Sequence, residues 1–344
     1  MYYDEKEKKN TLKLRELISG LPPFCKDFFR SIEPRTTSRT RIAYAYDLHV
    51  FFNYLKESNP SLNEKIELTD LDKLTFQDIE EYMEYLKYYQ SPNSKDVINS
   101  TQGIKRKIAT LRSFYKYYYN NGLINTNPAS KVTLPKLRDK DIIRLDVNEV
   151  VDYINTVESG VDLSNKMLKF HEKTKVRDTA IITLLLGTGI RVSECVGINI
   201  SDIDFKNTAI NIKRKGGKEA TIYFSDEVSK ALSEYMAKRK NIDNVETDSE
   251  NAFFLSLQNK RISVRAVENL VKKYAKIVTP LKHITPHKLR STYGTNLYQE
   301  TDDIYLVASV LGHNDVNTTK KHYAAIEDNK KRLSRNVVKL RDKN

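Results

Sequence analysis

Residues 187–194 read Gly-Thr-Gly-Ile-Arg-Val-Ser-Glu, and the way the chain changes around them sets the expected fold. The stretch before them, residues 178–186, is strongly apolar and predicts a short helix that Gly187 ends. The two glycines allow a tight turn, so Arg191 is expected where the next helix begins. Glu194 follows three residues later and could orient the guanidinium. Taken alone the pattern is weak, because most Gly-x-Gly turns are only turns.

Outward from this turn, the C-terminal half mixes helices with a hairpin. Residues 208–215 and 219–224 alternate as strands around Gly216-Gly217, which is typical of a β-hairpin. Residues 261–278 predict a helix with an apolar face made of Val264, Val267, Leu270, Val271 and Tyr274. Two polar stretches without an apolar period predict irregular surface segments, at residues 155–175 and 241–251.

The N-terminal half predicts helices. One has Ser38 as its expected N-cap and an apolar face of Tyr44, Leu48, Phe51 and Leu55. A second begins near Phe76. A third, capped by Ser100, has the expected buried stripe Ile104, Ile108, Leu111, Tyr115 and Tyr118. The expected organisation is a helical domain over residues 1–134, a linker over 135–145 and a second domain over 146–344.

Composition favours a soluble protein with a polyanionic partner. The 344 residues carry a formal net charge of +13, and a basic balance of this size favours nucleic acid, although a basic protein can simply stay soluble. The sequence has no apolar run long enough to span a membrane and no signal peptide, so a cytoplasmic protein is expected. Its only cysteines, Cys25 and Cys195, support neither a disulfide framework nor a zinc site.

Basic side chains gather on two predicted helices of the N-terminal half. They lie off the buried stripes and are candidate DNA contacts: Arg39, Arg41, Lys105, Arg106, Arg112 and Lys116. The alternative is two ordinary solvated helix faces.

Three further motifs of the C-terminal half carry candidate chemistry. Lys215 lies at the hairpin tip between Arg214 and Lys218, where several cations could meet a phosphate backbone. In residues 285–290, Thr-Pro-His-Lys-Leu-Arg, the first two residues suit a helix start, which puts His287 and Arg290 on one face of its first turn. Such a helix start also favours anions. The third motif is Leu-Gly-His at residues 311–313, followed after eight intervening residues by His-Tyr at 322–323.

Taken together, these motifs resemble the tyrosine recombinase (phage integrase) family, and within it most closely the XerS type of single recombinase. The matching residues, in chain order, are Arg191, Lys215, His287, Arg290, His313 and Tyr323. The resemblance covers the catalytic half, and the helical first half is similar to the family's core-binding domain. One departure is Ser291. Relatives commonly have a histidine at this position, which lies outside the catalytic set.

The resemblance implies a set of catalytic roles. Arg191 and Arg290 would hold the non-bridging phosphate oxygens, on which charge develops. Tyr323 would be the nucleophile of a 3′-phosphotyrosyl intermediate, and Lys215 would protonate the leaving 5′ oxygen.

The resemblance also implies roles for two histidines, and it implies that the site needs no cofactor. His287 would assist proton transfer at the tyrosine, and His313 would hydrogen-bond the phosphate. Neither metal nor ATP would be required, and the sequence contains no P-loop.

The implied architecture is mainly α. It is a C-shaped clamp of two domains, an all-α, SAM-like core-binding domain and a mixed α/β catalytic domain with a small β-sheet. The tail, with Ile326, Leu333, Val337 and Leu340 on one helix face, would dock on a neighbouring protomer or fold back on its own domain. The implied partners are double-stranded DNA with inverted half-sites and three further protomers in a tetramer on DNA. A septal DNA translocase is a further candidate partner.

The resemblance leaves the biological role open. Chromosome-dimer resolution at a dif-like site fits the XerS-like features, and a phage or conjugative-element integrase is the main alternative. A DNA-binding regulator with a silent site and a type IB topoisomerase are alternatives of other kinds.

Overall fold

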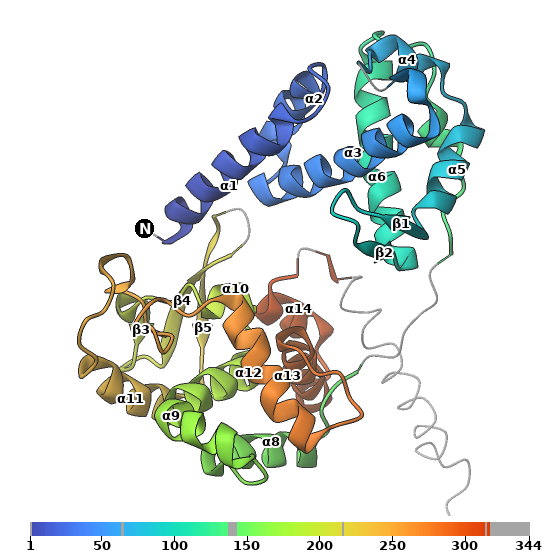
Figure 1. Ribbon diagram of the computed structural model, residues 1–344. Coiled ribbons are helices and arrows are strands. Elements are labelled where there is room, and N and C mark those ends of the chain that lie inside the picture. Colours follow the sequence, from blue (N-terminus) through green and yellow to red (C-terminus); the bar gives the residue numbers. More distant parts are fainter. Residues whose placement is uncertain (1, 63–64, 137–142, 215–216, 314, 317–344) are drawn as a thin grey trace, which may run out of the picture. The chain divides into compact units, whose positions relative to one another are not determined.

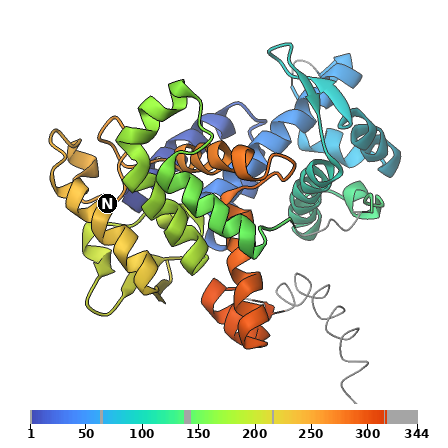
Figure 2. The same ribbon diagram turned by 90° about the horizontal axis from the view of Figure 1, so that it is seen from below.

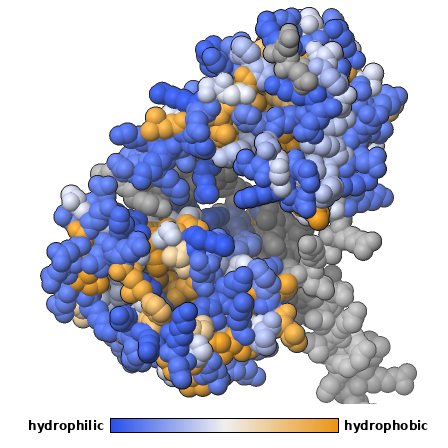
Figure 3. All heavy atoms as spheres, viewed as in Figure 1, coloured by the Kyte–Doolittle hydropathy of each residue, from blue (hydrophilic) through white to orange (hydrophobic). Residues whose placement is uncertain are grey.

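The computed structural model of the protein describes residues 2–62, 65–136, 143–214, 217–313 and 315–316. Within these ranges the chain is mostly helical and divides into two compact units, residues 1–140 and 141–344 (Figure 1). None of the helices in the described ranges is both long enough and apolar enough to cross a membrane. Polar side chains cover most of the face of the molecule in Figure 3.

The N-terminal unit is a helical bundle with one small hairpin. Its helices are α1 (Tyr2–Ser19), α2 (Cys25–Ile32), α3 (Ser38–Ser58), α4 (Leu68–Lys73), α5 (Phe76–Tyr85), α6 (Thr101–Asn120) and α7 (Pro128–Lys131). The hairpin pairs β1 (Tyr88–Gln90) with β2 (Asp96–Ile98) in antiparallel register. The sequence does not predict this hairpin, because the strands are only three residues long and the burial of their side chains alternates weakly.

The core of this unit is aromatic. The five residues predicted as the buried stripe of α6 are all buried, which confirms that prediction. Phe114, on the same helix, lies at the centre of the core, with its ring centroid 5.1 Å from that of Phe28 and 5.0 Å from that of Tyr118. Rings at these separations in edge-to-face geometry pack favourably. The helix positions follow from this packing more than from helix propensity.

Replacing Phe114 should therefore destabilise the N-terminal unit strongly. Phe114→Ala removes a fully buried ring and leaves a cavity, so the free energy of unfolding should fall by about 3–5 kcal/mol. Urea denaturation of the full chain, followed by circular dichroism, measures the change. Tyr119→Ala, on the same helix but 48% exposed, is the control and should change the stability little. Equal losses for the two variants would contradict this description of the core.

One predicted helix start was wrong by one residue. The N-cap of α3 is Thr37, whose hydroxyl accepts a hydrogen bond from the backbone N–H of Thr40, whereas Ser38 is the first helical residue. The Ser38 hydroxyl is buried and instead donates to the carboxylate of Glu7 in α1. The Ser100 cap of α6 is confirmed, because its hydroxyl accepts from the Gly103 N–H.

The C-terminal unit surrounds a long central helix. Its helices are α8 (Val147–Ser159), α9 (Asn165–Thr188), α10 (Val192–Cys195), α11 (Asp226–Lys240), α12 (Val264–Val278), α13 (Pro286–Thr301) and α14 (Ile304–Leu311). Helix α9 packs against α8, α11 and α13 (Figures 1 and 2). A three-stranded antiparallel sheet of β3 (Ile203–Asp204), β4 (Ala209–Lys213) and β5 (Glu219–Tyr223) completes the unit.

The predicted hairpin is confirmed as β4 and β5, but three other expectations for this unit were wrong. Residues 155–175 are not irregular, because α8 and α9 cover most of them and present a polar face to solvent. Gly187 does not end its helix. It lies inside α9, where a Cβ would overlap Val228 of α11, so close packing accounts for the glycine. The next predicted helix begins at Val264 rather than Arg261, since Ser263 is its N-cap.

Candidate active site

The turn after α9 determines where Arg191 lies. Gly189 ends the helix with a left-handed φ of 63°, and a Cβ at this position would overlap the ring of Tyr293. Arg191 then becomes the N-cap of α10. Arg191 therefore lies at the start of the next helix, as its motif predicted.

Glu194 fixes the Arg191 guanidinium. One carboxylate oxygen accepts from Arg191 Nη1 at 2.9 Å, and the other accepts from the Arg191 backbone N–H at 2.7 Å. Glu194 is buried, whereas the Arg191 side chain keeps 37% of its surface exposed. The guanidinium is thus held by a buried carboxylate, while part of the side chain stays exposed.

The second arginine comes from the first turn of α13. Thr285 and Pro286 occupy the N-cap and first helical positions, as predicted. His287 is exposed, but Arg290 is only 5% exposed. Arg290 Nη1 donates to the carbonyl oxygen of Gly189 at 2.6 Å, so α13 is tied directly to the turn that carries Arg191.

Both arginines converge on the loop that ends α14. Gly312 closes this helix with a left-handed φ of 62°, and the N–H of His313 donates to the carbonyl of Ala308. Arg191 Nη2 donates to the Gly312 carbonyl at 3.2 Å, and Arg290 Nη2 donates to the Leu311 carbonyl. Arg191, Arg290 and the backbone leading to His313 therefore form one connected cluster, although they are up to 122 residues apart in the sequence.

The hairpin contributes one described residue to this cluster. Arg214 Nη2 donates to the Val310 carbonyl at 2.9 Å, so its side chain turns toward α14. Lys218 is exposed. Lys215 and Tyr323 lie outside the described residues, as does the tail from Ile326.

Other nucleophiles near the site are poorly suited to reaction. Cys195, beside Glu194, is completely buried, and burial raises the pKa of its thiol to about 12, so it stays protonated at neutral pH. Tyr293 is half-buried against Gly189, and burial raises the pKa of its phenol. None of the described residues forms a group of three or more His, Cys, Asp or Glu side chains suited to a metal ion.

The predicted DNA contacts of the N-terminal unit divide into two groups. Arg39 and Lys116 are exposed and Lys105 is partly buried. The other three guanidiniums have partners within the protein. Arg41 pairs with Glu33, Arg106 with the buried Asp47, and Arg112 donates to the carbonyls of Ala129 and Val132. Arg112 thus bonds to the end of α7, where the last carbonyls of a helix lack donors of their own.

Several cations of this unit lie close to one another. A pocket of about 470 Å³ is lined by seven residues: Arg35, Arg112, Ser113, Lys116, Tyr117, Asn120 and Asn121. Near the start of α3, burial lowers the pKa of Lys6, and the charge of the nearby Arg39 lowers it further.

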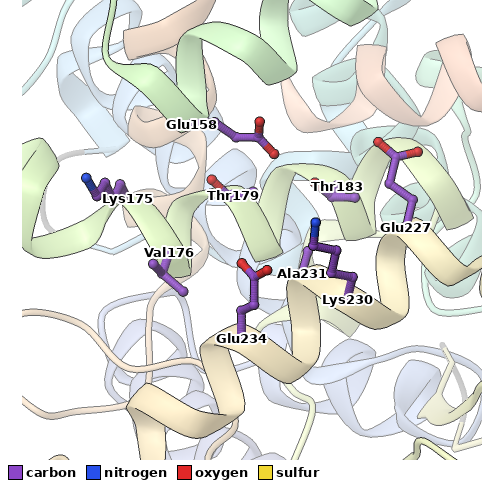
Figure 4. A pocket seen from close by; sticks show the side chains of 9 residues that line it. All are labelled: Glu158, Lys175, Val176, Thr179, Thr183, Glu227, Lys230, Ala231 and Glu234. Atoms are coloured by element: carbon purple, nitrogen blue, oxygen red, sulfur yellow. The ribbon is translucent and has the colours of Figure 1, made fainter.

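A second pocket has a different character. It occupies about 440 Å³ between α8, α9 and α11, and Figure 4 shows its lining. Its charged residues are Glu158, Glu227, Glu234, Lys175 and Lys230. Carboxylates outnumber cations, so this pocket is unsuited to a phosphodiester.

Two family descriptions match the chain. Residues 137–330 match the phage integrase family, and residues 26–122 match the phage integrase N-terminal SAM-like domain. The first match covers more than half of the chain and includes Arg191, Arg290 and the loop at Gly312.

Relatives and solved structures agree with this assignment. The chain is 33% identical to tyrosine recombinase XerC of Caldanaerobacter subterraneus subsp. tengcongensis, with 94% of this chain and 89% of the relative covered. It is 30% identical to tyrosine recombinase XerS of Streptococcus gordonii, with 93% and 96% covered.

The fold is shared with more distant recombinases. The Tn1549 transposon integrase in complex with transposon right end DNA aligns with a TM-score of 0.66 at 17% identity, over 90% of this chain and 99% of that one. The XerH recombinase bound to palindromic difH substrate aligns with a TM-score of 0.65 at 18% identity, over 87% and 79%. The chain belongs to the phage integrase family and is a tyrosine site-specific recombinase.

Proposed function

We propose that the protein cuts and rejoins double-stranded DNA through a 3′-phosphotyrosyl link at Tyr323, without metal or ATP. The observation that carries this proposal is the convergence of Arg191 and Arg290 on the loop at Gly312. Two guanidiniums fixed from separate elements can bind the non-bridging oxygens of one phosphate. Their charge stabilises the pentacoordinate transition state, in which those oxygens gain negative charge.

The remaining roles follow from the same chemistry. The Tyr323 oxygen attacks phosphorus, and the bond from phosphorus to the 5′ oxygen breaks. Lys215 gives its proton to the departing oxygen, because an alkoxide leaves poorly. His287 takes part in proton transfer at the tyrosine, and His313 donates a hydrogen bond to the phosphate. Reversal by a second strand's 5′ hydroxyl rejoins DNA with no external energy source.

We propose chromosome-dimer resolution at a dif-like site as the biological role. The XerS and XerC relatives favour it, and a XerH structure holds its dif substrate. Four protomers would act on two sites, each with inverted half-sites, and exchange strands through a Holliday junction. A septal DNA translocase is a candidate activator.

Integration of a mobile element is the second candidate, favoured by the likeness to the Tn1549 integrase. The two roles differ in substrate. A plasmid with two copies of the short inverted repeat from the protein's own chromosome should be resolved into two circles, whereas an integrase would require element ends.

The same experiment separates two further alternatives. A plasmid without the repeat is the control and should remain supercoiled. Relaxation of that control would indicate a type IB topoisomerase, and site binding without any cleavage would indicate a silent DNA-binding regulator.

Binding to DNA should depend strongly on salt. If about six phosphates are neutralised, the logarithm of the association constant should fall against that of salt concentration with a slope near −5. Gel-shift titrations between 50 and 200 mM salt, concentrations over which such contacts weaken strongly, measure this slope. Lys116→Ala and Arg39→Ala should each make it shallower by about one unit. A nearly flat slope would contradict wrapping of the duplex by the basic faces of α3 and α6.

A further inference from the structure

A third arginine bonds to the same helix end as Arg191 and Arg290. Arg214 directly follows β4 in the segment that joins β4 to β5. Its Nη2 donates to the carbonyl of Val310 at 2.9 Å, and its guanidinium packs so closely on Gly312 that a Cβ there would overlap it. The side chain therefore joins the hairpin to the carbonyl end of α14.

The surroundings of Arg214 fix it in this orientation. Its backbone N–H donates to the Lys218 carbonyl at 2.7 Å, and its own carbonyl accepts from the Gly217 N–H at 3.2 Å. Its Nε is buried and has no hydrogen-bond partner among the described residues. A guanidinium in this position faces helix carbonyls, whose partial negative charge attracts it, rather than water.

The end of α14 has supports besides Arg214. Arg191 and Arg290 bond to the Gly312 and Leu311 carbonyls, and the His313 N–H bonds back into the helix. Loss of Arg214 would leave these bonds in place. The hairpin would lose its tie to α14 at the residue that directly precedes Lys215, and consecutive Cα atoms are only about 3.8 Å apart.

We propose that Arg214 is a positioning residue for DNA cleavage, which ties the hairpin carrying Lys215 to the carbonyl end of α14. The inference rests on the proposed function, in which Lys215 protonates the leaving 5′ oxygen. It gives Arg214 a different task from the DNA contact suggested by its place in the sequence, since the guanidinium is held by the protein's own carbonyl.

Arg214→Ala should slow cleavage without weakening DNA binding. On a nicked suicide substrate at saturating protein, the single-turnover rate should fall about 10- to 100-fold, because a small displacement of a reacting group has effects of that size. The affinity for one site and its salt slope should stay as in the wild type.

The matched control is Arg265→Ala. It removes the same kind of side chain from an exposed position on α12 and should cleave at the wild-type rate. A parallel loss of affinity and salt slope in Arg214→Ala would instead make Arg214 a phosphate contact and overturn the proposal.

A sulfur-substituted substrate identifies the step that Arg214 supports. When sulfur replaces the bridging 5′ oxygen, a thiolate leaves and needs no proton. Sulfur should therefore restore cleavage by both Lys215→Ala and Arg214→Ala, whereas Arg290→Ala should gain little. Rescue of Lys215→Ala without rescue of Arg214→Ala would contradict the proposal. Rescue of Arg214→Ala alone would make Arg214 itself the acid and would also overturn it.

A second variant tests the contact itself. Gly312→Ala places a Cβ where the Arg214 guanidinium lies, so it should reduce the cleavage rate. In the Arg214→Ala background that collision is absent, and Gly312→Ala should reduce the rate by a smaller factor. Equal factors in the two backgrounds would contradict the contact. If wild-type protein forms no covalent adduct on any DNA, the proposed function fails instead, and this outcome is distinct from all the others.

Discussion

Tyr323→Phe should abolish the covalent protein–DNA complex while leaving folding and DNA affinity nearly unchanged. The substitution removes only the phenolic oxygen, and without that nucleophile no phosphotyrosyl bond can form. A nicked suicide substrate traps the wild-type adduct, because the short cleaved strand diffuses away and cannot be rejoined. A denaturing gel then measures the adduct, and the mutant should show none.

Tyr293→Phe is the matched control. Tyr293 packs against Gly189 in the same unit, and burial raises the pKa of its phenol, so it is poorly suited to act as the nucleophile. The control should form the adduct as the wild type does. Should Tyr323→Phe keep forming an adduct, or Tyr293→Phe lose it, the nucleophile would have to be assigned elsewhere.

Arg290→Ala should lower the single-turnover cleavage rate by about a thousandfold. The loss of one charged donor from a transition state that gains charge has effects of 10²–10³, and Arg290 also holds the turn that carries Arg191. Because Arg290 is buried, the variant should also lose about 1–3 kcal/mol of stability, so rates are compared at a temperature where it is folded.

Arg261→Ala separates the two effects. Arg261 also donates to backbone carbonyls, those of Val196 and Ile198, but it has no proposed role at the phosphate. It should lose similar stability and keep its cleavage rate once folded. A rate for Arg290→Ala within tenfold of that of Arg261→Ala would show that Arg290 is a structural residue only.

The sequence predicted best those elements whose own residues carry the signal. The stripe of α6 follows from a helical period of apolar residues, and the turn before Arg191 follows from Gly189. The start of α13 follows from Thr285-Pro286. Each of these features depends only on residues within one short segment and on their local backbone preferences.

The failures arose where distant residues decide the structure. Gly187 was expected to end a helix, but it lies inside α9, where a Cβ would overlap Val228 of α11, so the glycine serves close packing and not a helix end. The polar segment 155–175 is helical because α8 and α9 pack against other helices along part of their surface. Tertiary packing of this kind overrides local propensity and leaves little trace in the segment itself.

The orientation of two arginine side chains also could not be predicted from the sequence. Arg112 and Arg214 look like surface cations, yet both donate to carbonyls at helix ends far along the chain. A sequence shows which side chains are cationic, but backbone carbonyls are present at every residue. Which of them lack donors becomes clear only once the helix ends are placed.

The most direct test of the central proposal is to identify the residue that carries the DNA. After trapping on a suicide substrate and digestion with nuclease and trypsin, the peptide of residues 322–330, His-Tyr-Ala-Ala-Ile-Glu-Asp-Asn-Lys, is analysed by mass spectrometry. We predict a nucleotide remnant on Tyr323, linked through its 3′ phosphate. A remnant on any other residue, or a 5′ linkage, would contradict the proposed mechanism.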